Sequence, residues 1–221
     1  MVPAYRLFPM GSPTTRASVL LAAATEELAW REPAIADLAA TVGVPNFRRG
    51  RPRRPHFAEL ARMICYQQLA GSAARAIHGR FEALFDGPAT AEGVLSLPDE
   101  RLRSAGLSAS KARSIQDLAR HVVDRDVRLN VIARLPDEEV IRELTLVRGI
   151  GTWTAHMFLI FQLGRLDVWP VDDYGVRKGY ARLFGNGNVA SARELQPLGD
   201  RFRPYRSVAA WYCWRAADTL I

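Results

Sequence analysis

The sequence predicts an all-α protein whose helices form one domain or two interlocked lobes. Apolar residues recur every three or four positions through most of the 221 residues, as half-buried helices require. No segment shows the strict alternation of a half-buried strand, and no long internal repeat is found. With 48% hydrophobic and 24% charged residues, the composition is that of a globular chain long enough to bury a substantial core.

The first predicted elements are two amphipathic helices, over about 14–30 and 33–42. The segment 47–55 that follows contains five arginines, one glycine and two prolines, a composition that cannot pack as a regular element. We therefore expect a linker or an exposed loop around 48–54. Its arginines either touch phosphates or are merely solvated charges.

The rest of the chain also has helical periodicity. Pro136 and the three acidic residues after it are typical of a helix start, because acidic side chains favour the positive N-terminal end of a helix. Gly106 and Leu107 separate two further helices. The helices expected in this part of the chain cover about 57–85, 99–105, 108–123, a segment from 136, a segment from about 152, a segment from about 173, and about 204 to 221.

The balance of charge favours a polyanionic partner. There are 30 Lys and Arg against 23 Asp and Glu, a formal charge of +7, and the isoelectric point is about 10.0. Cys65 and Cys213, the only cysteines, lie in apolar helical patterns and are expected to be buried free thiols. Two cysteines are too few for a four-cysteine zinc or iron–sulfur site, and the four histidines lack metal-ligand spacing. No cofactor is expected.

No long uncharged apolar run resembles a membrane span, and the N-terminal segment lacks a signal-peptide pattern. We therefore expect no membrane association. The predicted location is the bacterial cytoplasm, with association with the nucleoid when the protein acts on DNA.

The most informative segment is 146–155, in which Gly149-Ile150-Gly151 separates two helices. The glycines permit positive φ and let a phosphate approach the backbone, while the N-terminus of the helix beginning near Thr152 favours negative charge. Ile150 is expected to anchor the turn in the core. A plain helix–helix turn is the alternative, but the complete pattern through Thr154, in a basic chain, favours a hairpin that grips DNA without reading its sequence.

The segment 106–112 resembles this hairpin more weakly, because it also has a glycine before a helix start. Ser108 is expected to cap the following helix, and Lys111 could face DNA. A simple capped turn is the favoured interpretation here.

Two adjacent carboxylates follow the hairpin by about twenty residues. Asp172 is expected to cap the next helix, with Asp173 in its first turn. A capping role for both is the alternative interpretation. Breaking an N-glycosidic bond, however, builds positive charge on a sugar, and a carboxylate beside that sugar stabilises the charge and orients water. Aromatic side chains that could line a pocket for an unstacked base lie in or after the hairpin: Trp153, Trp169, Tyr174, Trp211, Tyr212 and Trp214.

These motifs resemble those of the helix-hairpin-helix–GPD superfamily of base-excision glycosylases, and within it the 3-methyladenine DNA glycosylase II (AlkA-like) branch. The resemblance covers roughly residues 57 to 221 and, more loosely, the two N-terminal helices. It rests on Val147-Arg148-Gly149-Ile150-Gly151-Thr152-Trp153-Thr154-Ala155, on Asp167-Val168-Trp169-Pro170-Val171-Asp172-Asp173-Tyr174, and, in support, on Ile64-Cys65-Tyr66-Gln67-Gln68-Leu69, Pro204-Tyr205-Arg206-Ser207 and Trp214.

The resemblance implies a two-lobed helical fold without a β domain, in which the active site lies in the cleft between the lobes. One lobe would combine 1–56 with 170–221. The other would cover 57–169 and include the helix-hairpin-helix at 146–163. The implied partner is double-stranded DNA containing a damaged base, bound by a monomer.

The resemblance also implies roles for individual residues. The catalytic carboxylate falls on Asp173, and the pocket residues fall on Trp153, Met157, Tyr174 and Trp214. The hairpin backbone would hold a DNA phosphate, often with a monovalent cation at the carbonyls of Val147 and Gly149. The side chain that fills the gap left by the flipped base would come from Gln67-Gln68-Leu69, and Gln68 and Leu69 are favoured equally. The full set of expected DNA-binding residues is Gln67, Gln68, Leu69, Val147, Gly149, Ile150, Gly151, Thr152 and Thr154.

Departures from the pattern of other members narrow the expected chemistry. Members with lyase activity carry a lysine where this chain has Trp153, so no Schiff-base step is expected. The four cysteines of iron–sulfur members are missing. Arg148 stands where proline is common before the hairpin glycine, and it could add a phosphate contact.

The motifs and the resemblance together predict a monofunctional glycosylase that flips alkylated purines out of duplex DNA, with deaminated and etheno purines left open as further substrates. Hydrolysis of the glycosidic bond would leave an abasic site. The alternatives are a non-catalytic helix-hairpin-helix protein that binds or senses damaged DNA, and a glycosylase–lyase.

Overall fold

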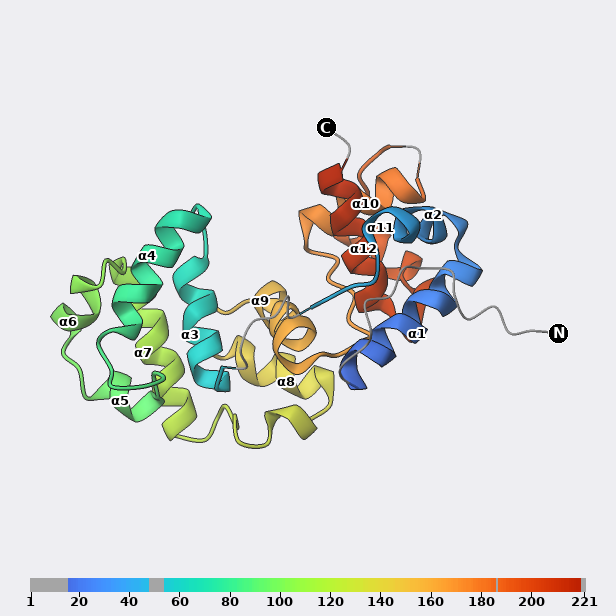
Figure 1. Cartoon of the computed structure of the whole chain (residues 1–221). Coiled ribbons are helices and arrows are strands. Elements are labelled where there is room, and N and C mark those ends of the chain that lie inside the picture. The colour runs from blue at the N-terminus through green and yellow to red at the C-terminus, as the bar shows by residue number, and fades with distance from the viewer. Residues whose placement is uncertain (1–15, 48–53, 186, 220–221) are drawn as a thin grey trace. The chain divides into compact units, whose positions relative to one another are not determined.

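The computed structural model describes residues 16–47, 54–185 and 187–219, and this part of the chain contains helices and no strand (Figure 1). The prediction of an all-α protein is confirmed. The α-helices are α1 (Arg16–Arg31), α2 (Pro33–Val42), α3 (His56–Tyr66), α4 (Gly71–Glu82), α5 (Ala91–Leu95), α6 (Asp99–Ser104), α7 (Ala109–Val123), α8 (Asp137–Thr145), α9 (Thr152–Met157), α10 (Tyr174–Leu183), α11 (Ala192–Leu198) and α12 (Arg206–Thr219). Short 3-10 helices, η1 (Ile132–Arg134) and η3 (Asp200–Phe202), and a π-helix, η2 (Phe158–Leu163), complete the list.

Contacts divide the chain into two compact units. The first combines residues 1–50 with 164–221, and the second is the continuous stretch 51–163. The sequence had placed the boundaries a few residues later, at 56/57 and 169/170. The difference at the second boundary arises because the segment after Gly164 is bonded to α12 rather than to the hairpin: the backbone N–H of Ser207 donates to the carbonyl of Leu166 at 2.9 Å.

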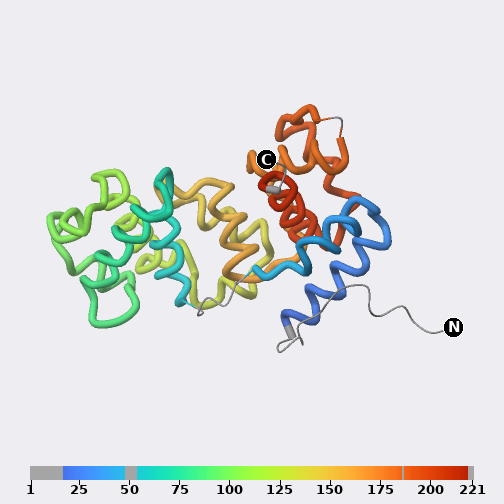
Figure 2. The backbone as a smooth tube through the Cα atoms, turned by 45° about the horizontal axis from the view of Figure 1, so that its top comes forward, coloured from blue at the N-terminus to red at the C-terminus, as the bar shows by residue number. Residues whose placement is uncertain are grey.

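The first unit is built on α10 and α12, which cross at very close range. A Cβ on Gly179 would lie 1.8 Å from the carbonyl oxygen of Cys213, so only glycine lets the two helices approach this closely. Helices α1 and α2 pack on the same core (Figure 2), with Leu28 and Ile35 fully buried. Glu32, between α1 and α2, accepts a hydrogen bond from Arg201 Nε at 2.7 Å and so ties the N-terminal helices to η3.

The second unit packs α3, α5 and α6 against the long helix α7, with α4 beside α3 (Figure 1). Its core contains Ile64, Ile115, Leu118 and Phe158, all completely buried. The apolar face of α7 recurs at three- and four-residue spacing, as the sequence indicated, and Ser108 caps α7 by accepting the N–H of Lys111 at 3.3 Å.

Several elements differ from those expected. The predicted helix over 57–85 is broken between α3 and α4, where Gln68 has a φ of +54°. Helices α5 and α11, of 5 and 7 residues, were not predicted. α11 nevertheless carries a capping box of Ser191 and Glu194, a local signal that could have located it.

The predicted loop at 48–54 lies outside the described residues except for Arg54. Only this arginine can be compared with the prediction. Arg54 Nε lies 3.5 Å from the carboxylate of Glu82. None of the described helices combines the length and apolar character that crossing a membrane requires.

Candidate active site

The hairpin between α8 and α9 is a tight turn centred on Gly149. Gly149 has a φ of +77°, a conformation that L side chains rarely adopt. A Cβ on this residue would also lie 2.7 Å from Ser114 Oγ on α7. The turn is closed by the N–H of Ile150, which donates to the carbonyl of Val147 at 3.0 Å, and both of these side chains are buried as anchors.

Gly151 serves a different purpose from Gly149. Its φ of −95° is open to any residue, so Gly151 does not use the positive φ that glycine permits. A Cβ added to Gly151 would meet no atom within 4 Å, and the residue is exposed at the N-terminal end of α9. The bare backbone and the open space suit close approach by a phosphate.

The side chains that follow the hairpin lie in different environments. Thr152 is exposed, and Trp153 exposes 43% of its surface. Thr154 is only 4% exposed and Met157 only 7%. The Thr154 hydroxyl lies 3.4 Å from Gln67 Nε2, and the predicted role of this buried residue in DNA binding stays a prediction.

Helix α7 contacts the hairpin through a hydrogen bond that was not predicted from the sequence. The backbone N–H of Arg148 donates to Asp117 Oδ2 at 2.8 Å. Asp117 also lies 3.7 Å from His121 Nε2 and 3.8 Å from Arg120 NH1. No local pattern distinguishes Asp117 from other acidic residues on an exposed helix face, because its partner is 31 residues away.

The turn 67–70 also contacts the hairpin. Gln67 Nε2 donates to the carbonyl of Gly149 at 2.9 Å. Gln68 and Leu69 are exposed, and Leu69 exposes 39% of its surface. The second unit thus brings together the two sequence motifs that were expected to touch DNA.

Asp173, in the first unit, is the N-cap of α10. Its Oδ1 accepts the backbone N–H of Val176 at 2.9 Å, whereas Asp172 is exposed and precedes the cap. The predicted assignment of the cap to Asp172 is therefore wrong. The helix begins one residue later than expected, because the turn closed by the N–H of Asp173 and the carbonyl of Pro170 ends only there.

Trp214 on α12 completes the surroundings of this carboxylate. Its indole Nε1 donates to Asp173 Oδ1 at 2.9 Å, so the same oxygen receives two N–H groups. A Cβ on Gly175 would lie 2.9 Å from the Trp214 ring and 3.0 Å from Asp173 Oδ1. Gly175 was not predicted as a site residue, yet its small size lets the tryptophan reach the carboxylate. Tyr174 is 61% exposed, and Arg177 lies 5.6 Å from its ring centroid.

The loop that leads to Asp173 is fixed at several points. Arg206 Nε donates to Asp167 Oδ1 at 2.8 Å, and the fully buried Ser207 accepts the N–H of Val168 at 2.9 Å. The indole of Trp169 donates to the carbonyl of Leu195 at 3.0 Å. Trp169 is only 4% exposed, so this aromatic residue anchors the loop in the core.

The two cysteines, Cys65 and Cys213, are buried and unreactive. Burial raises the pKa of the Cys213 thiol, and the negative charge of Asp173 acts in the same direction. Burial likewise raises the pKa of Cys65 to about 12. Both cysteines are therefore neutral core residues at physiological pH, as the sequence indicated.

The carbonyls of Val147 and Gly149, which were predicted to hold a monovalent cation, each accept one hydrogen bond from the protein. Val147 O accepts the N–H of Ile150, and Gly149 O accepts the amide of Gln67. A backbone carbonyl oxygen has two lone pairs, so a monovalent cation at these oxygens stays a prediction. Within 16–47, 54–185 and 187–219, no three His, Cys, Asp or Glu side chains cluster as metal ligands.

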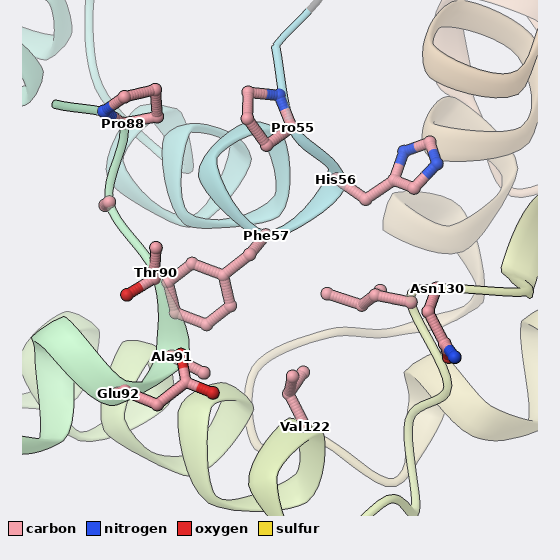
Figure 3. Close-up of a pocket in the computed structure, with 11 residues that line it drawn as sticks. Pro55, His56, Phe57, Pro88, Thr90, Ala91, Glu92, Val122 and Asn130 are labelled. Atoms are coloured by element: carbon pink, nitrogen blue, oxygen red, sulfur yellow. The ribbon is translucent and has the colours of Figure 1, made fainter.

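A pocket of about 280 Å³ lies elsewhere in the second unit, beside the N-terminal ends of α3 and α5 (Figure 3). Phe57 and Val122 point into it, with Thr90 and Glu92 on one side. None of the residues predicted to contact DNA or the base lines this pocket.

Comparison with known proteins places these motifs in context. Residues 61–203 match the family model described as HhH-GPD superfamily base excision DNA repair protein. The chain is 34% identical over 179 residues to DNA-3-methyladenine glycosylase 1 of Schizosaccharomyces pombe, a match that covers 79% of this chain and 78% of that protein.

Two solved structures show the same fold. The Schizosaccharomyces pombe 3-methyladenine DNA glycosylase in complex with abasic DNA has a TM-score of 0.76 at 32% identity, over 87% of this chain and 95% of that one. The DNA-3-methyladenine glycosidase of Bacillus halodurans has a TM-score of 0.79 at 34% identity, over 89% of each chain.

Proposed function

Because this chain belongs to the HhH-GPD superfamily of base excision DNA repair proteins, we propose that it is a monofunctional DNA glycosylase. Its substrates are alkylated purines in duplex DNA, and deaminated and etheno purines are further candidates. The products are the free base and an abasic site. Relatives named as 3-methyladenine glycosylases, at 32–34% identity, support this substrate class.

The observation that carries the proposal is the fixed carboxylate of Asp173. Two N–H groups, from Val176 and Trp214, hold Oδ1 at 2.9 Å each. A carboxylate held in this way needs no reorganisation when positive charge develops near it, which is the condition for effective electrostatic catalysis. As the purine leaves, the deoxyribose becomes oxocarbenium-like, and Asp173 stabilises that charge and orients the attacking water.

The proposal divides the remaining tasks between the motifs. The hairpin backbone from Val147 to Gly151 binds a phosphate, which gives affinity that depends on salt but not on sequence. A side chain of the turn 67–70 enters the base stack as the nucleotide rotates out. Aromatic faces suit the positive charge of alkylated purines, and the proposed pocket residues are Trp153, Met157, Tyr174 and Trp214. We further propose that the protein acts as a monomer on the chromosome in the bacterial cytoplasm.

Trp153 supports hydrolysis rather than a lyase reaction. It occupies the first turn of α9, where lyase members place an amine nucleophile, and an indole cannot form a Schiff base. Treatment with borohydride during incubation with damaged DNA is expected to trap no covalent adduct. A trapped adduct would instead favour the glycosylase–lyase alternative.

The decisive experiment replaces Asp173 with Asn. Asn retains an oxygen that can accept from Val176 and Trp214 but lacks the negative charge, so folding should persist while base release stops. Released bases from an alkylated duplex are measured by mass spectrometry, and binding to abasic DNA is measured in parallel.

Near-normal turnover by Asp173→Asn would refute the assignment. A wild-type protein that binds abasic DNA but releases no base from alkylated or deaminated duplexes would favour the non-catalytic damage-binding alternative.

A further inference from the structure

The first of the three residues expected to meet the DNA stack is engaged with the protein instead. Gln67 Nε2 donates to Gly149 O at 2.9 Å and lies 3.4 Å from Thr154 Oγ1, so its polar head is directed into the hairpin. Gln67 is partly buried, whereas Gln68 and Leu69 are exposed. A side chain bonded in this way cannot insert between bases without first giving up its contacts.

The turn that carries Gln68 and Leu69 has an unusual backbone. Gln67 ends α3 with a ψ of 133°, and Gln68 then adopts a φ of +54°, a left-handed conformation that non-glycine residues adopt rarely. Such a conformation persists when surrounding contacts over-determine it. Gln67 joins this turn to the hairpin and α9 through the contacts of its Nε2 with Gly149 O and Thr154 Oγ1.

Helix α3 provides a firm base for the turn. Arg62 is fixed by two hydrogen bonds from its Nε to the carboxylate of Glu59, at 2.9 and 3.0 Å, and its guanidinium lies 5.0 Å from the ring centroid of Tyr66. Tyr66 in turn packs edge-on against His78 of α4, at 5.9 Å between centroids. Gln67 is the one residue between Tyr66, where α3 ends, and the exposed pair Gln68 and Leu69.

We propose that Gln67 is a positioning residue that sets the register between the phosphate-binding hairpin and the DNA wedge formed by Gln68 and Leu69. This inference rests on the proposed function. A wedge must enter the base stack at a fixed distance from the phosphate that the hairpin holds, because displacement by about 1 Å is enough to impair a reaction that depends on alignment. The amide of Gln67 links the two directly, so that binding of the phosphate places the wedge.

The hydrogen bond to Gly149 is the feature to remove. Gln67→Met keeps the length and shape of the side chain but has no N–H group to donate. Gln196→Met makes the same chemical change at an exposed position of α11 in the first unit and serves as the control. The double variant Gln68→Ala/Leu69→Ala removes the wedge itself.

Wedge entry is measured without any reaction, on a duplex that contains a tetrahydrofuran abasic analogue flanked by 2-aminopurine. Binding of the wild-type protein should change the 2-aminopurine fluorescence, and the Gln68→Ala/Leu69→Ala variant should not produce the change. Gln67→Met should lose most of the change while its affinity for the duplex stays within about threefold, because the hairpin still holds the phosphate. Gln196→Met should behave like the wild-type protein.

A double-mutant cycle on single-turnover base release separates positioning from general structural damage. Gln67→Met should lower the rate about tenfold in the wild-type background and less than about twofold in the background without the wedge, because a missing wedge cannot be misplaced. An equal loss in both backgrounds would overturn the inference, as would an unchanged fluorescence signal in Gln67→Met or no signal from the wild-type protein. If the fluorescence changes occur as expected but the wild-type protein releases no base, only the proposed glycosylase function is refuted.

Discussion

Trp214 donates its indole N–H to the same oxygen of Asp173 that caps helix α10. The donor atoms, Trp214 Nε1 and the backbone nitrogen of Val176, each lie 2.9 Å from Oδ1. Two donors from different helices restrict the movement of this oxygen more than a single donor would. The cap of α10 and the contact with α12 thus orient the carboxylate that we propose as the catalytic group.

Replacing Trp214 with Phe tests this orientation. The variant keeps an aromatic ring but loses the N–H donor, and a hydrogen bond to a charged group contributes roughly 1.5–3 kcal/mol, which corresponds to about 10- to 150-fold in rate. We expect single-turnover base release to fall within that range while affinity for undamaged duplex is unchanged. Trp211→Phe, on the same helix but without a hydrogen bond to Asp173, is the control. Equal rates in the two variants would show that the indole N–H does not matter.

The correction of the helix cap leads to a prediction about stability. Asp173→Ala should lower the free energy of unfolding by about 0.5–2 kcal/mol, the usual effect of removing an N-cap, and Asp173→Asn should largely retain it. Asp172→Ala should change it by less than about 0.5 kcal/mol, since this side chain is exposed and precedes the cap. Thermal or denaturant unfolding measures all three. The reverse ranking of the two alanine variants would restore the cap to Asp172.

The fold class and both functional motifs could be read from the sequence because each depends on local signals. Helical periodicity, a Gly-X-Gly turn and a carboxylate pair before a helix require no knowledge of distant residues. The error at Asp172 and Asp173 has the same origin: adjacent acidic residues are equally good caps, and only the turn closed by the carbonyl of Pro170 decides between them.

Residues that act through long-range contacts could not be found in this way. Asp117 reaches the hairpin from 31 residues away, and Arg206 reaches Asp167 from 39. Gly175 is required only because the Trp214 ring passes over it. The break after Gln67 is likewise stabilised by Gly149, 82 residues later, so helical periodicity alone predicted one continuous segment through it.

His78 predicts a pH dependence of stability. It is only 5% exposed on α4, and burial lowers its pKa below the ordinary value of 6.5, although the nearby carboxylate of Glu82 acts in the opposite direction. Because the folded state then binds a proton less readily than the unfolded chain, protonation favours unfolding. The contribution of neutral His78 is complete above about pH 6.5 and is lost as the pH falls from there through the lower pKa of the folded state.

The free energy of unfolding of the wild-type protein should therefore decrease from pH 7 to pH 5. The decrease per pH unit should be smaller in His78→Phe. Denaturant unfolding at several pH values measures both slopes, and a comparison at pH 8 shows the cost of the substitution itself. Identical slopes would mean that His78 titrates alike in the folded and unfolded states.

The two glycines of the hairpin should respond differently to substitution by alanine. Gly149→Ala places a side chain at a φ of +77° and a Cβ 2.7 Å from Ser114 Oγ. Left-handed backbone alone costs an L residue about 1–2 kcal/mol, so the free energy of unfolding should fall by at least about 1 kcal/mol. Binding to DNA should weaken together with folding, which makes this variant uninformative about the phosphate by itself.

Gly151→Ala separates the two effects, because its φ of −95° and the open space around it let alanine fit without strain. Stability should change by less than about 1 kcal/mol, because alanine restricts the unfolded chain more than glycine does but is a poorer N-cap for α9. If a phosphate lies against this bare backbone, the added methyl group must push it away, and affinity for undamaged duplex at fixed salt should fall about tenfold. Fluorescence anisotropy measures the affinity and thermal unfolding the stability. A stable Gly151→Ala protein with wild-type affinity would place the phosphate elsewhere than at the N-terminal end of α9.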